Sequence, residues 1–204
     1  MREPAWHTRE ILRELIPRYC RGLVLDAGAG TTKYRRLIEE HASRYIACDD
    51  WPDDRLTMLA SINRLPFGDE TFDTVICTMV LEHDPDPMAG LAELKRVLKP
   101  GGHMIFATPW IQPHHAIPAD YWRFSYYGLE KLFGIFGFEI IEARSEGDRL
   151  VTLAGVLKWL FPTVMKLSRY WGSIARLYSR CCYRRDRIHP NSLGYTLAVR
   201  KPAE

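Results

Sequence analysis

The segment most informative about the fold is Gly22-Leu-Val-Leu-Asp26-Ala-Gly28-Ala-Gly30-Thr31, because an apolar strand is expected here to pass directly into a glycine-rich turn. The next residues, about 34–41, are expected to form a helix. Glycines at such a junction allow a tight turn and let a ligand approach the backbone near the positive end of a helix dipole. A turn of this kind can also simply connect two elements, so it needs support from the rest of the sequence.

The same alternation of strand and helix continues along the chain. Strands are expected over 44–48, 72–78, 103–108, 138–142 and 193–199, and helices over 8–16, 87–98 and 127–136. Pro100-Gly101-Gly102 is expected to end the helix before the strand at 103, and a helical stretch over 150–187 interrupts the pattern. Alternating strands and helices predict an α/β fold with a mostly parallel sheet and helices on both faces.

Composition is that of a globular protein of one domain. The chain has 204 residues, 47% of them hydrophobic and 26% charged, and a formal net charge of +3. The N-terminal segment lacks the apolar core of a signal peptide, and no apolar run reaches the roughly 18 residues of a membrane span. Five cysteines without disulfide-framework or metal-site spacing favour a reducing compartment. We therefore expect a cytoplasmic protein.

An acidic residue supports the functional interpretation of the glycine turn. Asp49 lies 19 residues beyond Gly30, at the end of the next predicted strand. A carboxylate in this place can accept both hydroxyls of a ribose, so the two features predict a nucleoside-containing cofactor at the carboxyl ends of the first two strands. A dinucleotide fingerprint would have a third glycine where this chain has Lys33, which counts against a nicotinamide cofactor.

Five segments together resemble one family. They are VLDAGAGTTKY (24–34), YIACDD (45–50), LPFGDETFDTVICTMVLEHDPDP (65–87), LKRVLKPGGHMIFATP (94–109) and YWRFSYYGLEKLFGIFGFEII (121–141). In order and spacing they resemble the class I S-adenosylmethionine-dependent methyltransferases, particularly the type 11 group. The resemblance implies a Rossmann-like, mostly parallel seven-stranded sheet, with an antiparallel last strand at 193–199 inserted beside its neighbour. It also implies a single methyltransferase domain over 1–204, with its core at about 22–142.

The resemblance assigns a cofactor site for S-adenosylmethionine. Asp26, Gly28 and Gly30 match the motif around the methionine part, and Asp49 matches the ribose-binding acid. Ser61 and Ile62 fall where the family contacts adenine. The predicted cofactor site is completed by Ala29, Asp50 and Thr78.

Two departures from the family pattern stand in this site. Ser61 replaces the usual acid that accepts from the adenine amino group, so adenine recognition is expected to lean on the backbone of Ile62. Thr32 replaces a glycine that many members have, which restricts the backbone near the methionine carboxylate and adds a hydroxyl donor.

Methyl transfer needs alignment and desolvation more than an acid, and it needs a base only when the acceptor is a group such as a hydroxyl. The candidate bases are His83, His114 and His115. His83 with Glu82 has the alternative role of orienting a loop. The predicted acceptor-binding residues are Trp110, His115, Asp120 and Tyr121. A metal site in this loop lacks a clear fourth ligand, so none is predicted; a purely structural loop, with Trp122 and Phe124 in the core, is the other alternative.

Charge divides the chain into two unlike parts. Residues 1–143 hold 16 basic and 21 acidic side chains, a net −5, and residues 144–204 hold 12 and four, a net +8. Between 160 and 187 an apolar stripe and a basic stripe recur at helical spacing. This basic amphipathic insertion either docks on the domain, faces an anionic membrane or a lipid-linked acceptor, or makes a dimer contact. Nucleic acid is not expected, because no recognition motif accompanies the arginines.

The sequence thus predicts an enzyme that methylates an unidentified acceptor, with small molecules, sugars and lipid-linked glycans favoured. A methyltransferase-like adaptor without activity and, behind it, a nicotinamide-dependent oxidoreductase remain as alternatives. The cytoplasmic protein could also associate peripherally with a membrane.

Overall fold

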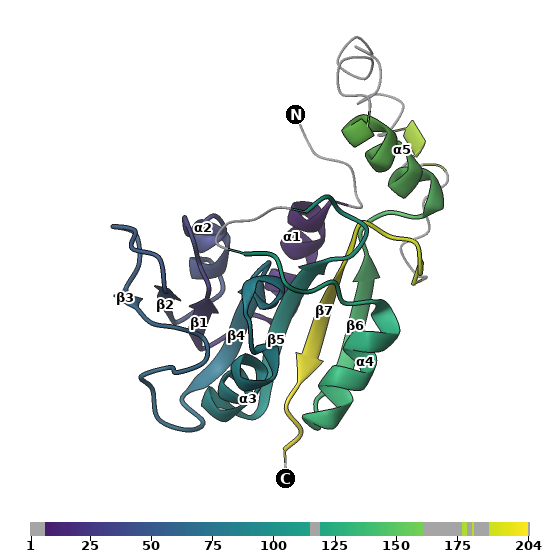
Figure 1. Cartoon of the computed structure of the whole chain (residues 1–204). Helices are drawn as coiled ribbons and strands as arrows, with labels where there is room; N and C mark the ends of the chain where they lie inside the picture. Colours follow the sequence, from purple (N-terminus) through teal and green to yellow (C-terminus); the bar gives the residue numbers. More distant parts are fainter. Residues whose placement is uncertain (1–6, 115–118, 161–176, 179–180, 182–187, 204) are drawn as a thin grey trace.

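A single sheet organises the computed structural model, which describes residues 7–114, 119–160, 177–178, 181 and 188–203 (Figure 1). Within these residues seven strands pair in the order β3-β2-β1-β4-β5-β7-β6. The strands are β1 (Leu23–Ala27), β2 (Arg44–Asp49), β3 (Met58–Leu59), β4 (Phe72–Thr78), β5 (Leu98–Pro109), β6 (Glu139–Ser145) and β7 (Gly194–Arg200).

The direction of the strands confirms the predicted fold class. β1 pairs in parallel with both β2 and β4, β2 with β3, and β4 with β5. β7 is antiparallel to both neighbours and lies between β5 and β6, as predicted for the last strand. The carboxyl ends of β1, β2, β4 and β5 therefore meet at one edge of the sheet, where binding sites of open α/β sheets are found.

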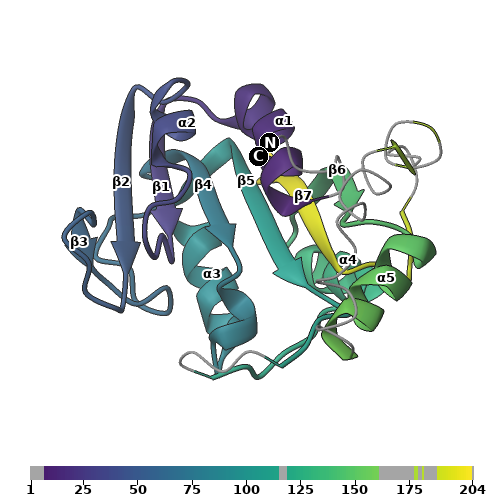
Figure 2. The same ribbon diagram turned by 90° about the horizontal axis from the view of Figure 1, so that it is seen from above.

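Helices cover both faces of the sheet, which Figure 2 shows from above. α1 (Thr8–Tyr19) and α2 (Arg35–Glu39) pack on one face, where Leu12, Ile16 and Ile38 meet Val24, Ile76 and Ile105. α3 (Pro87–Val97) and α4 (Tyr126–Ile135) pack on the other. Apolar residues at spacings of four and three, Pro87, Leu91, Leu94 and Val97, give α3 its buried face.

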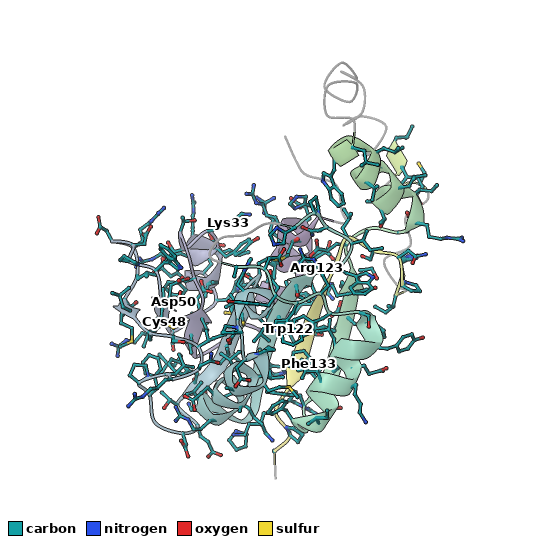
Figure 3. All side chains as sticks on the ribbon, viewed as in Figure 1. Lys33, Cys48, Asp50, Trp122, Arg123 and Phe133 are labelled. Atoms are coloured by element: carbon teal, nitrogen blue, oxygen red, sulfur yellow. The ribbon has the colours of Figure 1, made fainter. Side chains whose placement is uncertain are left out.

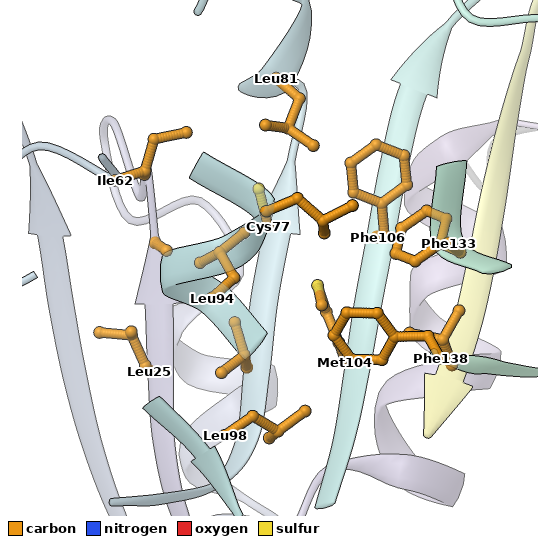
Figure 4. Close-up of a cluster of buried hydrophobic side chains, with 14 of the residues drawn as sticks. Leu25, Ile62, Cys77, Leu81, Leu94, Leu98, Met104, Phe106, Phe133 and Phe138 are labelled. Carbon is orange, nitrogen blue, oxygen red and sulfur yellow. The ribbon is translucent and has the colours of Figure 1, made fainter. Parts of the chain in front are cut away.

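The larger core cluster lies between the sheet and the helices α3 and α4. Leu25, Cys77, Met104 and Phe106 rise from β1, β4 and β5 into this cluster (Figure 4). Phe106 meets Phe133 of α4 edge to face, with ring centroids 5.2 Å apart. The neighbouring strands β1, β4 and β5 are therefore held together by one buried apolar layer.

The start of β5 differs from the sequence prediction. The helix ends at Val97, and pairing with β4 begins at once, at Leu98 opposite Phe72. The Pro-Gly-Gly segment therefore lies inside the strand as an irregularity and does not separate helix from strand. Gly102 is required there because a Cβ would lie 2.8 Å from the carbonyl oxygen of Lys99.

The late helical stretch is described in part. α5 (Arg149–Leu160) follows β6 and continues beyond the carboxyl edge of the sheet (Figure 1). Most of the predicted basic amphipathic segment, residues 161–176, 179–180 and 182–187, lies outside the described residues. The short strand β3 was not predicted.

Candidate functional site

The glycine turn after β1 is joined to the end of β2. The backbone N–H groups of Gly28 and Ala29 donate to the Cys48 carbonyl oxygen at 2.9 and 3.0 Å. Gly28 has φ +72°, and a Cβ there would lie 2.3 Å from Val80 Cγ2, so only glycine fits. Gly30, at φ +49°, faces open space, since no heavy atom lies within 4 Å of a Cβ built on it. The turn thus offers bare backbone to a ligand.

Asp49 holds this turn from the end of β2. One carboxylate oxygen accepts from the Gly30 N–H at 2.8 Å and the other from the Trp51 N–H at 3.0 Å. A carboxylate has about four lone-pair positions, so each oxygen can accept another hydrogen bond. Burial, and then the adjacent Asp49 carboxylate, raise the pKa of Asp50.

A cleft of about 500 Å³ opens beside these groups. This volume is within the range of roughly 300–1,000 Å³ typical of small-molecule sites. Its lining comes from the turn after β1, the end of β2, residues 60–63, and the segment after β4: Gly28, Gly30, Asp49, Asp50, Trp51, Ala60, Ser61, Ile62, Asn63, Met79, Val80, His83, Asp84 and Pro85.

The structure brings six of the predicted cofactor residues together in this lining: Gly28, Gly30, Asp49, Asp50, Ser61 and Ile62. Ala29, Thr78 and Asp26 do not line the cleft. Asp26 is buried in β1, where the Tyr45 hydroxyl donates to its carboxylate at 2.7 Å. Burial raises the pKa of Asp26 to about 6, although the bond from Tyr45 opposes this rise. Asp26 therefore has a structural position in the strand that leads into the turn, and not a position on the cleft wall.

Both sequence departures have a structural counterpart. Thr32 has φ +51°, a left-handed conformation that non-glycine residues adopt at some cost, which accounts for the glycine common in the family. Ser61 lines the cleft without a charge, and its hydroxyl oxygen accepts from the Asn63 N–H at 3.3 Å.

The 3₁₀ turn after β4, Leu81–His83, places two titratable groups near the cleft. Glu82 is fully buried, and within the described residues neither of its carboxyl oxygens has a hydrogen-bond partner. Burial raises the pKa of Glu82 to about 8. His83 lines the cleft, and its Nδ1 is bonded to the carbonyl oxygen of Ala119. Because a carbonyl only accepts, Nδ1 carries the proton, so in the neutral ring Nε2 is the basic nitrogen.

The loop after β5 crosses over this turn. The N–H groups of Tyr121 and Trp122 both donate to the backbone carbonyl oxygen of Glu82, at 2.8 and 3.2 Å. Figure 3 shows Trp122 and Arg123 near the middle of the molecule, while Cys48 and Asp50 lie on the β2 side. The loop is thereby fixed to the segment that also carries His83.

The predicted acceptor residues have different surroundings. Trp110 packs against the larger core cluster, and the buried Asp120 carboxylate forms an ion pair with Arg123. Tyr121 is exposed, and so is His114, which does not line the cleft. His115 lies outside the described residues. Among the described side chains no group of three His, Cys, Asp or Glu is arranged to hold a metal ion.

Several lining residues escaped the sequence prediction: Trp51, Asn63, Met79, Asp84 and Pro85. Asp84 accepts from the Asn63 side-chain amide at 2.8 Å, which ties residues 60–63 to the segment after β4. The Asp-Pro-Asp-Pro run at 84–87 is a signal in the sequence for a helix start beside the cleft, because aspartates before prolines are common at helix starts. Asp86 is indeed the N-cap of α3.

Comparison with known proteins agrees with this geometry. Residues 25–106 match a family model described as a methyltransferase domain. A demethylmenaquinone methyltransferase of Clavibacter sepedonicus is 33% identical over 102 residues, which cover 42% of this chain and 42% of that protein. An uncharacterised protein of Methanocaldococcus jannaschii is 28% identical over 174 residues, which cover 78% of this chain and 72% of that protein. For three curated relatives, the aligned part spans only 16%, 17% and 42% of their length.

Solved structures share the fold. One is a chain of the complex between the Haloferax volcanii Trm112 methyltransferase activator and a putative methyltransferase, with TM-score 0.66, 20% identity and coverage of 98% of this chain and 91% of that one. Another is the Burkholderia thailandensis 1,6-didemethyltoxoflavin-N1-methyltransferase with bound S-adenosylhomocysteine, with TM-score 0.60, 16% identity and coverage of 94% and 75%. Residues 25–106 thus match a methyltransferase domain, and the described residues have the fold of class I S-adenosylmethionine-dependent methyltransferases.

Proposed function

We propose that the chain transfers a methyl group from S-adenosylmethionine to a small organic acceptor, a class that includes sugars and lipid-linked glycans. The observation that carries the proposal is the position of the Asp49 carboxylate, at the carboxyl end of β2 and beside the open Gly30 turn, on the wall of a cleft of about 500 Å³. Two of the compared proteins bear names of methyltransferases that act on small molecules.

The cleft residues fit such a cofactor. Asp49 would accept hydrogen bonds from the two ribose hydroxyls, because each of its oxygens has one backbone donor and room for a second. Ile62 and Ser61 would bound the adenine, with the backbone of this segment replacing the missing acid. The bare Gly28–Gly30 backbone would lie along the methionine part.

S-adenosylmethionine supplies, when bound, a methyl carbon activated by a positively charged sulfur. The chain then has to align the acceptor with that carbon and keep water out. An acceptor with a hydroxyl also needs a base, and His83, which lines the cleft, would serve through its Nε2 atom. The bond from Nδ1 to Ala119 orients the ring for this role.

Calorimetric titration with S-adenosylhomocysteine tests the cofactor part of the proposal. Asp49→Ala is expected to weaken binding by at least about ten-fold, because hydrogen bonds to a charged group contribute about 1.5–3 kcal/mol each. Asp54→Ala is the matched control, since Asp54 is an exposed acid of the same region outside the cleft lining, and should bind as the wild type does. Equal affinity of Asp49→Ala and wild type would overturn the proposal.

Transfer itself is tested separately. A wild-type protein that binds S-adenosylhomocysteine and moves a labelled methyl group to an acceptor fraction from cells supports the enzyme. Displacement of S-adenosylhomocysteine by NAD would instead favour an oxidoreductase. An adaptor without activity would bind the cofactor and leave the label on it.

A further inference from the structure

α5 begins at a fixed point on the domain. Asp148 caps the helix, as one carboxylate oxygen accepts from the N–H groups of Leu150 and Val151 at 2.9 and 3.1 Å. The other oxygen of Asp148 accepts from the Tyr178 hydroxyl. The first turn of the helix is therefore held in one orientation.

The inner face of α5 packs on the segment that leads into β7. The Thr152 hydroxyl donates to the Asn191 carbonyl oxygen at 2.9 Å, and Val151 and Thr152 are buried. Gly155 lets the helix approach Leu193, whose Cδ2 lies 3.1 Å from the position a Cβ would take. These contacts decide which face of α5 turns toward the domain.

The opposite face carries an uncovered stripe of leucines. Their exposed fractions are 60, 55, 39 and 65% for Leu150, Leu153, Leu157 and Leu160. A spacing of three, four and three residues places these side chains on one side of a helix. Trp159, which is 37% exposed, lies four residues after Gly155 and therefore on the other face, the one that packs on the domain. A contiguous exposed apolar surface of this kind marks an interaction site.

The amino-acid sequence of the segment that begins with α5 indicates the kind of partner. Residues 149–187 contain nine basic residues and one acidic residue, and Arg149 lies exposed at the start of α5. A segment that combines exposed leucines with an excess of basic residues has the composition of segments that lie in the interface of anionic bilayers.

We propose that the leucine stripe of α5 docks on the surface of an anionic lipid bilayer. The helix has 12 residues and is about 18 Å long, well short of the roughly 30 Å of the hydrocarbon core, so it lies in the interface. Among the described helices none is long and apolar enough to cross a membrane. Docking here would hold the carboxyl edge of the sheet, and with it the cleft, near the membrane surface.

Co-sedimentation of the whole chain with vesicles tests this docking. The two vesicle types are pure phosphatidylcholine and phosphatidylcholine with about one-third phosphatidylglycerol, at low salt and again at about 0.5 M salt, where charges are screened. The wild type is expected to sediment with the anionic vesicles only, and less at high salt. Leu153→Glu/Leu157→Glu should lower the partition coefficient by at least about ten-fold, because two leucines leave the apolar phase.

Ile135→Glu provides the matched control, since Ile135 is a 59% exposed apolar residue at the end of α4. It should sediment as the wild type does, and the thermal unfolding of all three proteins should show that each is folded. Failure of the wild type to bind anionic vesicles at low salt would overturn the proposal. So would equal binding by the double variant, or a wild-type dimer that the double variant dissociates without any binding to vesicles.

Discussion

The buried Glu82 should make the stability of this protein depend on pH between about 5 and 8. Its pKa is raised by burial from 4.5 to about 8, so the folded state keeps a proton that the unfolded state has lost. A raised pKa of this kind contributes stability that is present below the unfolded value and is lost as the pH rises to the folded value. Arg123 opposes the shift, while Asp120 and Glu146 add to it.

Glu82→Gln replaces the titratable carboxyl group by a neutral amide of nearly the same size. Each pH unit in the window lowers the wild-type stability by about 1.4 kcal/mol through Glu82 alone, so from about pH 5.5 to about pH 8 the loss is about 3 kcal/mol. At or below about pH 4.5 the variant and the wild type should have similar free energies of unfolding. The variant should be more stable by about 1.4 kcal/mol at about pH 5.5 and by about 4 kcal/mol at about pH 8, so the gap widens by about 3 kcal/mol.

Urea unfolding followed by circular dichroism at both pH values measures this difference. Glu93→Gln is a control of opposite sign, because the Arg96 guanidinium lowers the pKa of Glu93. Glu93→Gln should be destabilised by the same amount at both pH values, since Glu93 is ionised throughout the window. A constant gap between Glu82→Gln and the wild type would instead mean that Glu82 is already charged in the folded state near pH 5.5.

Three further substitutions test other parts of the structure. Gly28→Ala should lower stability by about 2–4 kcal/mol and abolish S-adenosylhomocysteine binding, through the contact with Val80 and the positive φ, as urea unfolding and calorimetry would show. Tyr45→Phe removes the hydrogen bond that lowers the pKa of Asp26, so it should raise that pKa and cost about 1–2 kcal/mol near neutral pH in the same unfolding assay. Asp148→Ala should cost about 1 kcal/mol and increase hydrogen exchange in the first turn of α5, because the helix loses its cap.

Long segments with a clear period could be predicted from the sequence. The bounds of β4 at Phe72–Thr78 match, because an apolar strand between polar turns leaves no other register. α1 runs past its predicted end, to Tyr19, and includes Pro17 in its last turn. β3, with two residues, is too short for any period to show.

Site residues that directly follow a predicted strand could be placed from the sequence. Residues whose place in the site depends on side-chain direction or on an unusual backbone conformation could not. Gly30 and Asp49 follow strands that pair in parallel, so their meeting follows from the fold. Asp26 belongs to the same motif, yet the alternation along β1 turns its side chain toward Tyr45 and away from the cleft. Met79 lines the cleft with φ +58°, a left-handed backbone conformation that a methionine in the sequence does not indicate.

A crystal structure with S-adenosylhomocysteine would show directly whether Asp49 holds the ribose. Both ribose hydroxyls are expected within hydrogen-bond distance of the Asp49 carboxylate, with adenine against Ile62 and the sulfur directed toward the His83 side of the cleft. A ligand bound elsewhere on the chain, or no ligand at saturating concentration, would show that this cleft is not the cofactor site.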